Sequence, residues 1–435
     1  MNIWFNFPWV RWLAGAFLLF RGKLLVAAGR RFGGMNDLCR VVRILSNGML
    51  RRLAYADVMR TVKQIKSSGR NSFLDSFLLN PASDKCVTRY SISGRGDADI
   101  FRDIIVLKSR KEDEKGVILL KYGQTFDATV ALFDLSRLMD HYHIVLEPSW
   151  AGCCDPSILM YIASGQHVFI QTFTEEDHQF ILDVGSPFVP VRLGPADWVD
   201  ADLFVLDDLA EKRYDIVMVA NWARGKGHNR LFRALRQIRD RKIKVLLIGF
   251  PWWGRTAEDI RREARAVKND NIQFHIIEGI PQLEVARYLN ECRVFVFLSH
   301  KEGDNKALVE AMFANVPAIV YDKTIGGAPS RINPMTGMLS SDHDLARNIL
   351  YMLDHHSEYS AREWALAHTG SKVATQLLNR AIKRVVTDAG DSYTIGISEK
   401  CNVPNLMYKD NAKGPVFRSD YDFIETCRRT GKRTT

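Results

Sequence analysis

Two glutamates eight residues apart, Glu302 and Glu310, are the first candidates for chemistry in this sequence. Glu302 lies in a polar, glycine-containing loop, Ser299 to Asn305, which follows an apolar stretch typical of a buried strand. Glu310 lies in the helix predicted next, Lys306 to Ala314. At ~100° per residue it stands roughly 130° around from the centre of that helix's apolar face. We therefore expect the Glu310 carboxylate to face a crevice rather than the core.

A carboxylate in such a helix could accept hydrogen bonds from both hydroxyls of a ribose, and a loop carboxylate could hold the hydroxyls of a sugar. The whole stretch, Arg293 to Asp322, has the pattern of one strand–helix–strand unit. Beyond the carboxyl end of a parallel strand, a helix N-terminus offers free N–H groups and about half a positive charge, which would suit a diphosphate. Most glutamates at this spacing are solvated charges, so the pair alone leaves both interpretations open.

A second loop with phosphate-binding chemistry, Arg224-Gly225-Lys226-Gly227, follows the predicted strand Tyr214 to Ala220. Glycines on each side of Lys226 would let the backbone approach a ligand closely, and the ammonium could neutralise phosphate oxygens. Taken alone, the loop could equally be a solvated basic turn. Because the glutamate unit lies two or three strands later in the same predicted sheet, the two together favour a joint diphosphate site.

Strands and helices alternate in two series, from Ile104 to about Thr172 and from Tyr214 to Asp322, which is typical of parallel α/β sheets. With 435 residues, 46% of them hydrophobic and 25% charged, the chain is long enough for two ordinary globular domains. The predicted parts are a basic, aromatic helical extension (1–80), a first Rossmann-like domain (81–205), a second Rossmann-like domain (206–360), and C-terminal helices and a tail (361–435) that could pack back on the first domain.

Several local predictions concern the first half of the chain. We expect loops and short strands over 67–96, a single helix from Phe126 to Met139, and a linker from Phe188 to Phe204. The loops at two predicted strand ends, 123–125 and 148–152, are where an acceptor could bind.

The net charge of +10 is concentrated near the N-terminus: residues 1–70 carry thirteen Lys or Arg and two Asp. Tryptophan and phenylalanine alternate with these cations, and the longest uncharged apolar run, Trp12 to Phe20, has nine residues, well short of a membrane-spanning helix. A signal peptide would need a cleaner apolar core and a better cleavage site. Peripheral membrane association through residues 1–34, with cations attracted to anionic lipid, fits this pattern. An ordinary packed helix is the alternative.

The same segment argues less for nucleic acid, because its cations lie among large aliphatic side chains without an RNA- or DNA-binding motif. Seven cysteines without C-x-x-C spacing predict reduced thiols and a cytoplasmic protein. If residues 1–34 bind the membrane, the protein would lie at its cytoplasmic face. No group of His, Asp and Cys has the spacing of metal ligands, so we expect no metal.

The region from about Asp215 to Leu339 resembles the donor domain of retaining GT-B glycosyltransferases, the family 4-like enzymes also called glycosyl transferases group 1. S-x-x-E-G-x(6)-E-A-M-x-A-x-x-P-A-I-V resembles their E-x7-E signature. Three further segments match in family order: Lys226-Gly227-His228 looks like K-G-[HD], Ile248-Gly249 like the strand that ends in glycine, and Glu278-Gly279-Ile280-Pro281 like the loop that packs on the nucleobase.

The resemblance implies a GT-B fold, with two Rossmann-like domains facing across a cleft and a helical basic N-terminal extension. The first domain would hold the acceptor and the second the nucleotide sugar. Glu302, Lys226 and Arg224 would be catalytic. The residues that would contact the donor are Glu310, Gly303, Asp304, Asn305, Gly227, Gly249, Gly279 and Ile280.

Three departures from the family pattern stand near the expected site. Asn221 occupies the position of the usual arginine, the form E-G-D-N with Asp304 replaces E-G-[FY]-P, and no acceptor-side histidine can be assigned. Arg224 could replace the missing arginine from within the loop.

The sequence thus predicts a metal-independent glycosyltransferase that moves a sugar from a UDP- or GDP-sugar to a glycolipid or polysaccharide acceptor. Retention of anomeric configuration follows from the resemblance alone, and the donor is a substrate, so no cofactor is expected. The alternative, motivated by the departures, is a non-catalytic GT-B module that binds sugar or acts as a scaffold in envelope polysaccharide assembly.

Overall fold

The computed structural model describes residues 8–45, 47–68, 72–80, 83, 97–148, 152–402 and 407–429. Residues 1–7 of the predicted membrane anchor and 149–151 of the predicted acceptor loop lie outside this part of the chain. The chain forms two compact units. Unit 1 comprises 1–193, 378–398 and 410–435, and unit 2 comprises 194–377 and 399–409.

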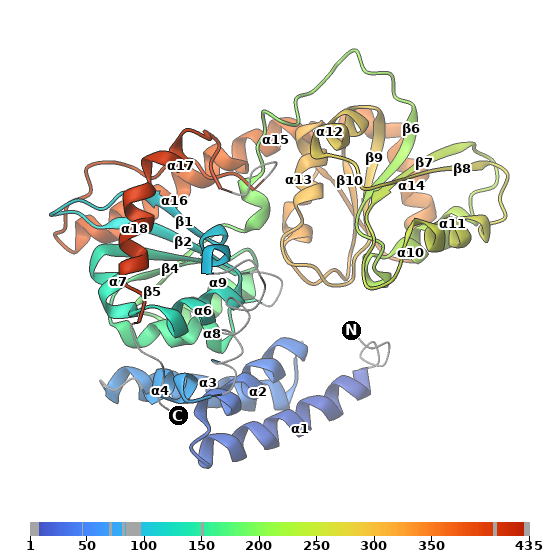
Figure 1. Cartoon of the computed structure of the whole chain (residues 1–435). Helices are drawn as coiled ribbons and strands as arrows, with labels where there is room; N and C mark the ends of the chain where they lie inside the picture. The colour runs from blue at the N-terminus through green and yellow to red at the C-terminus, as the bar shows by residue number, and fades with distance from the viewer. Residues whose placement is uncertain are drawn as a thin grey trace. The chain divides into compact units, whose positions relative to one another are not determined.

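Unit 2 is built on a six-stranded, all-parallel sheet in the order β11-β10-β9-β6-β7-β8 (Figure 1). Its strands are β6 (Tyr214–Val219), β7 (Ile243–Gly249), β8 (Ile272–Glu278), β9 (Cys292–Phe297), β10 (Ala318–Tyr321) and β11 (Gly337–Ser340). The chain begins at β6, moves outward through β7 and β8, and then returns to β9 on the other side of β6. The strand order therefore reverses between β6 and β9, which is where open α/β sheets bind ligands.

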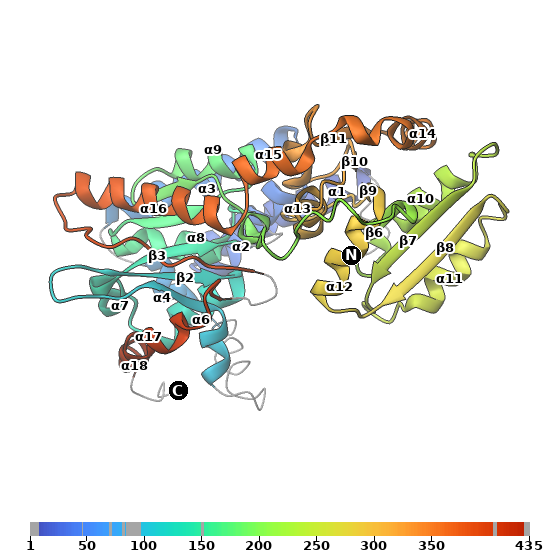
Figure 2. The same ribbon diagram turned by 90° about the horizontal axis from the view of Figure 1, so that it is seen from above.

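Helices cover both faces of this sheet (Figure 2). They are α10 (His228–Leu235), α11 (Ala257–Arg265), α12 (Gln282–Asn290), α13 (Lys306–Phe313), α14 (Leu345–His355) and α15 (Ala361–His368). Because successive strand residues point to opposite faces, Val217 of β6 joins the core shared with α12, α13 and α15, whereas Ile216 joins the core shared with α10, α11 and α14. The sheet is thus buried on both sides and its carboxyl edge is held in place.

Unit 1 contains a five-stranded sheet in the order β1-β2-β3-β4-β5. Its strands are β1 (Ile104–Lys108), β2 (Gly116–Lys121), β3 (Tyr142–Glu147), β4 (Val168–Gln171) and β5 (Phe188–Val191). The strands β2, β3 and β4 are parallel, as predicted, and β5 continues the parallel order. Because β1 pairs antiparallel with β2, the sheet is mixed. Its helices are α6 (Gly123–Leu132), α7 (Leu135–His141), α8 (Pro156–Leu159), α9 (Glu175–Val184), α17 (Lys413–Val416) and α18 (Arg418–Thr426).

Among the described residues, the α-helices that precede this sheet are α1 (Pro8–Ala27), α2 (Arg31–Ile44), α3 (Met49–Ser68) and α4 (Ser72–Leu78). They form a layer that packs within unit 1 on the side of α8, through contacts of α2 with α8 (Figure 1). The helix α16 (Ser371–Asp388) begins in unit 2 and ends in unit 1. Among the helices of the described residues, none combines the length and apolar character needed to cross a bilayer.

The structure corrects three local predictions. The expected single helix from Phe126 to Met139 is broken at Phe133, because the Asp134 carboxylate accepts a hydrogen bond from the Arg137 N–H and starts α7 anew. The predicted linker contains β5, which pairs with β4 along its whole length despite Pro190. In the predicted loop region 67–96, residues 72–78 form the helix α4, and residues 69–71, 81–82 and 84–96 lie outside the described part of the chain. The pair of Rossmann-like units and the helical N-terminal region confirm the predicted fold class, and the cleft between the units stays a prediction.

Candidate functional site

The loops that follow the neighbouring strands β6 and β9 meet at the switch point of the unit 2 sheet. The ammonium of Lys226, in the β6 loop, forms an ion pair with the carboxylate of Glu302, in the β9 loop. The two side chains are 19% and 22% exposed, so both are reachable from solvent while paired. The Ser299 hydroxyl also donates to the Gly225 carbonyl at 3.3 Å, which ties the two loops together. The structure thus joins the two predicted catalytic residues of opposite charge.

Gly227 and Gly249 allow these loops to approach the sheet closely. A Cβ on Gly227, whose φ is +88°, would lie 2.2 Å from the Leu298 carbonyl oxygen at the end of β9. A Cβ on Gly249 would lie 2.2 Å from the Ala220 oxygen after β6. Any side chain at either position would push the loops apart, so these predicted donor-site glycines act at least through backbone packing.

The Glu302 loop is also fixed from its other side. The Glu302 N–H donates to the Ile325 carbonyl at 3.0 Å, and the Gly327 N–H donates to the Gly303 carbonyl at 2.9 Å. A Cβ on Gly326 would stand 2.0 Å from the Glu302 oxygen. The backbone of the Glu302 loop is therefore held by contacts with residues 325–327, which fixes the point from which the Glu302 side chain extends.

The helix α13 starts directly after this loop. The Asn305 side chain accepts a hydrogen bond from the Leu308 N–H at 2.8 Å and caps the helix. No acidic residue stands in the first turn. The positive end of the α13 dipole therefore lies beside the Glu302 loop, and no carboxylate in the first turn of the helix neutralises it. This favours the binding of an anion at the carboxyl edge of the sheet.

The Asp304 side chain has a structural role that the sequence did not indicate. Its carboxylate receives two hydrogen bonds from the Arg331 guanidinium, at 3.1 and 2.7 Å, and one from the Ala196 N–H at 3.0 Å. Arg331 also pairs with Asp197 at 2.9 Å, and although burial opposes it, the two carboxylates raise the pKa of Arg331. The predicted donor contact at Asp304 is therefore left to its backbone N–H.

Glu310 is buried, 3% exposed, which contradicts the expectation that it stands clear of the core. α13 packs on the sheet and also against α12, α15 and the 3₁₀ helix Pro195–Trp198, so it is covered on more than its apolar face. Burial raises the pKa of the Glu310 carboxyl to about 7, and Lys306 opposes this rise only in part. The side chain is thus poised between its neutral and ionised forms near neutral pH.

Three further predicted residues lie at the ends of the same strands. Arg224 is exposed in the β6 loop, and no ion pair joins it to any residue in the described ranges. Gly279, with φ of +72°, follows β8, and its N–H donates to the Gly249 carbonyl at 2.9 Å. Ile280 is half-buried against the core shared with α12. All three therefore belong to the carboxyl edge of the sheet.

A set of hydrogen bonds around the buried Trp222, which stands in the same loop as Lys226, was not predicted. The Trp222 indole N–H donates to the Glu278 carboxylate at 2.5 Å, and the Arg255 guanidinium donates to the Trp222 carbonyl at 2.7 Å. Glu278 also accepts from the Ala257 N–H at 2.8 Å, which links the β8 end to α11. These contacts connect the loops after β6, β7 and β8. In the sequence, a tryptophan inside a glycine-rich basic loop was the available signal.

His228 opens α10 with its ring 5.5 Å from that of Trp222. Burial, followed by the positive charges of Arg255 and Lys226, lowers the pKa of this imidazole to about 3, so it is neutral at physiological pH. Neither ring nitrogen has a hydrogen-bond partner among the described residues. A neutral imidazole next to the Lys226 loop can offer one donor or one acceptor to a bound ligand.

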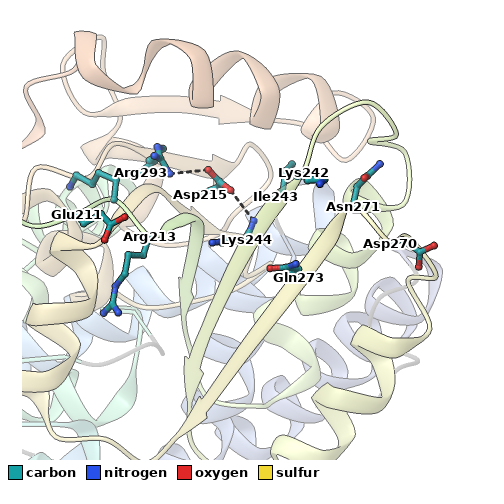
Figure 3. A pocket seen from close by; sticks show the side chains of 11 residues that line it. Glu211, Arg213, Asp215, Lys242, Ile243, Lys244, Asp270, Asn271, Gln273 and Arg293 are labelled. Atoms are coloured by element: carbon teal, nitrogen blue, oxygen red, sulfur yellow. Dashed lines mark hydrogen bonds and ion pairs between the residues drawn. The ribbon is translucent and has the colours of Figure 1, made fainter.

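The polar pocket in Figure 3 lies at the opposite, amino edge of the same sheet. It has a volume of about 460 Å³, and Asp215 bridges its floor by pairing with Arg293 at 3.0 Å and accepting the Lys244 N–H at 2.8 Å. It contains none of the predicted site residues. Within the described ranges, no group of three or more His, Cys, Asp or Glu side chains could hold a metal ion.

Residues 206–363 match the family described as Glycosyl transferases group 1. Similar solved structures include sucrose-phosphate synthase from Thermosynechococcus elongatus, with 16% identity over 62% of this chain and 74% of that chain and a TM-score of 0.48. Anabaena Alr3699/HepE in complex with UDP has 14% identity over 62% and 78% and a TM-score of 0.47. A glycosyltransferase from Rickettsia africae has 15% identity over 62% and 75% and a TM-score of 0.47. No curated protein matches the sequence.

The buried Asp197–Arg331–Asp304 group predicts a large stability effect. We expect Arg331→Met to lower the free energy of unfolding by about 3–5 kcal/mol, because it leaves two buried carboxylates without their cation. Urea denaturation followed by fluorescence measures this. The exposed pair Arg347–Asp344 provides the control, and Arg347→Met should change stability by less than about 0.5 kcal/mol. Equal effects of the two variants would contradict the structural role.

Proposed function

We propose that the chain transfers a sugar from a UDP- or GDP-sugar to a glycolipid or polysaccharide acceptor, with retention of anomeric configuration. The premise is the match of residues 206–363 to the family described as Glycosyl transferases group 1. The observation that carries this proposal is the pairing of Lys226 with Glu302 at the switch point between β6 and β9. It places a cation, a carboxylate and a helix N-terminus at one edge of the sheet.

In the proposed complex the donor diphosphate lies between Lys226 and the N-terminus of α13. The Lys226 ammonium exchanges its carboxylate partner for phosphate oxygens, and the freed Glu302 accepts hydrogen bonds from the hydroxyls of the donor sugar. The exchange keeps both charges paired in either state. The short backbone contacts around Gly227 and Gly326 support this arrangement, since they fix both loops before the donor arrives.

The chemical step breaks the bond between the anomeric carbon and the diphosphate oxygen and forms a bond from that carbon to the acceptor oxygen. The proton of the acceptor hydroxyl passes to a phosphate oxygen of the departing nucleoside diphosphate. Negative charge grows on the departing nucleoside diphosphate while the sugar gains oxocarbenium character. Lys226, the exposed Arg224 and the N–H groups at the start of α13 would stabilise this charge more strongly in the transition state than in the bound donor. The positive groups of this chain thereby take the place that a metal ion has in other transferases.

Glu310 is proposed to bind the ribose of the donor. Its ionised carboxylate would accept hydrogen bonds from both ribose hydroxyls, and these bonds would offset the cost of holding a charge at a buried position. Gly279 and Ile280, at the end of β8, would then border the nucleobase. The open space around the Gly279 Cα suits a planar ring.

The second candidate is a GT-B module that binds a sugar or acts as a scaffold in envelope polysaccharide assembly without transferring it. Asn221 favours it, because this residue stands where the family pattern has arginine and its side chain accepts a hydrogen bond from the Ala223 N–H at 3.1 Å instead of offering a charge. Release of nucleoside diphosphate in the presence of membrane glycolipid would favour the enzyme, and donor binding without release would favour the scaffold.

The donor site is tested by replacing one lysine at each edge of the sheet. The ligand is whichever of UDP-glucose, GDP-mannose and ADP-glucose gives the largest thermal shift with the wild type. We expect Lys226→Ala to weaken the binding of this ligand by about tenfold or more, because a phosphate contact is lost. Isothermal titration measures the affinity. Lys244→Ala, in the pocket of Figure 3, should leave it unchanged. Unchanged affinity in Lys226→Ala, or an equal loss in both variants, would count against the proposal.

The raised pKa of Glu310 predicts a pH dependence of donor binding. Since the carboxyl is largely protonated below its pKa of about 7 and ribose requires the ionised form, donor affinity should fall about tenfold from pH 8 to pH 6. Titrations across this range should show the fall in the wild type and a nearly flat profile in Glu310→Gln. A pH profile that is the same in both proteins would remove Glu310 from the ribose site.

A further inference from the structure

The helix α1 is apolar on two opposite sides. Its inner side packs tightly on α2: a Cβ on Gly22 would lie 3.1 Å from the Gly34 oxygen, and Leu18 and Leu19 are buried there. This side therefore supplies the packing that α1 needs within unit 1. A helix with apolar residues on two opposite sides is normally covered on both of them, so we expect a second apolar environment on the other side of α1.

The outer side of α1 carries six large apolar side chains, each between 52% and 70% exposed. They are Trp9, Trp12, Leu13, Phe17, Phe20 and Leu24. Their spacing of three or four residues puts them on one face, which runs about 22 Å along the axis at about 1.5 Å per residue. We call this the α1 outer face. Soluble proteins rarely leave so large a contiguous apolar patch uncovered without a binding partner for it.

The charges around this face are almost entirely positive. Residues 8–68 contain twelve Lys or Arg and two Asp. Both aspartates are used to hold α1 in place: Asp37 of α2 pairs with Arg21 at 2.6 Å, and Asp57 of α3 pairs with Lys23 at 3.1 Å. At about 100° per residue, Arg21 lies just outside one margin of the α1 outer face, and Lys23 lies within the face near its other margin.

More cations on the same helical layer are exposed and have no acidic partner among the described residues. They are Arg30, Arg40, Arg52 and Lys63. An apolar helix face on a layer that also carries uncompensated cations is complementary to a surface that is apolar inside and anionic outside. An anionic lipid bilayer has that profile, with acyl chains beneath phosphate headgroups.

We infer that the α1 outer face is a lipid-binding surface that lies in the interfacial plane of an anionic membrane. The tryptophans and phenylalanines would lie at the boundary between headgroups and acyl chains, and the cations of the layer would contact lipid phosphates. α1 would lie along the membrane rather than cross it, since its inner side is already packed on α2. This inference does not depend on glycosyl transfer, because lipid binding can be measured without a donor.

The test is flotation of the full chain with vesicles. We expect the protein to float with phosphatidylglycerol–phosphatidylcholine vesicles, to bind pure phosphatidylcholine vesicles less, and to lose binding as salt is raised. Phe17→Asp combined with Phe20→Asp should lower partitioning into the anionic vesicles at least about tenfold. Leu209→Asp, at a 96% exposed position in unit 2, is the matched control and should float like the wild type.

Thermal unfolding and nucleotide-sugar binding of the double variant should stay close to those of the wild type, because both side chains are mostly exposed, 60% and 70%, and both lie in unit 1, whereas the donor loops lie in unit 2. Flotation of the double variant at the wild-type level would overturn the inference. So would a wild type that binds no vesicles but forms a dimer, by light scattering, that the double variant abolishes, since the α1 outer face would then join two copies of the chain.

Discussion

The ion pair between Lys226 and Glu302 is the contact around which unit 2 is arranged. It spans the place in the sheet where the strand order reverses between β6 and β9. It can form because these strands are neighbours, although Lys226 and Glu302 are 76 residues apart in the chain. The positive end of α13 lies beside it. A diphosphate entering this edge would meet a cation already positioned and a carboxylate ready to be released toward a sugar.

Backbone packing holds the loops of Lys226 and Glu302 at the distance that this ion pair requires. Three glycines allow close backbone contacts in which a Cβ atom would clash with a carbonyl oxygen. They are Gly227, Gly249 and Gly326. On the other side of the Glu302 loop, Arg331 holds Asp304 in the interior. The functional groups on the surface thus depend on a buried polar anchor and on close backbone approaches, and rigidity of this kind is what preorganised electrostatic stabilisation requires.

The second domain and its candidate site could be predicted from the sequence because their evidence is local. Lys226 and Glu302 each stand in a glycine-containing loop directly after an apolar strand, and parallel strands bring such loops to one edge. The burial of Glu310 could not be predicted, because α13 is covered by segments that are distant from it in the sequence. Residues 195–198 come more than 100 residues before α13, and α15 comes about 50 residues after it. The partner of Asp304 was hidden for the same reason. In unit 1, the break between α6 and α7 was not predicted, because apolar residues recur at helical spacing on both sides of Phe133. The antiparallel direction of β1 was not predicted, because the periodicity of apolar residues contains no information on strand direction.

The central claim is that a nucleotide sugar binds at the carboxyl edge of the unit 2 sheet. Hydrogen–deuterium exchange with and without UDP-glucose or GDP-mannose tests it most directly, because it locates the ligand without a substitution. The account predicts slower exchange at 221–228 and 299–310, with no change at 211–215 and 242–244, which line the pocket at the opposite edge. Protection confined to that opposite pocket, or no protection anywhere in unit 2 at saturating donor, would contradict it.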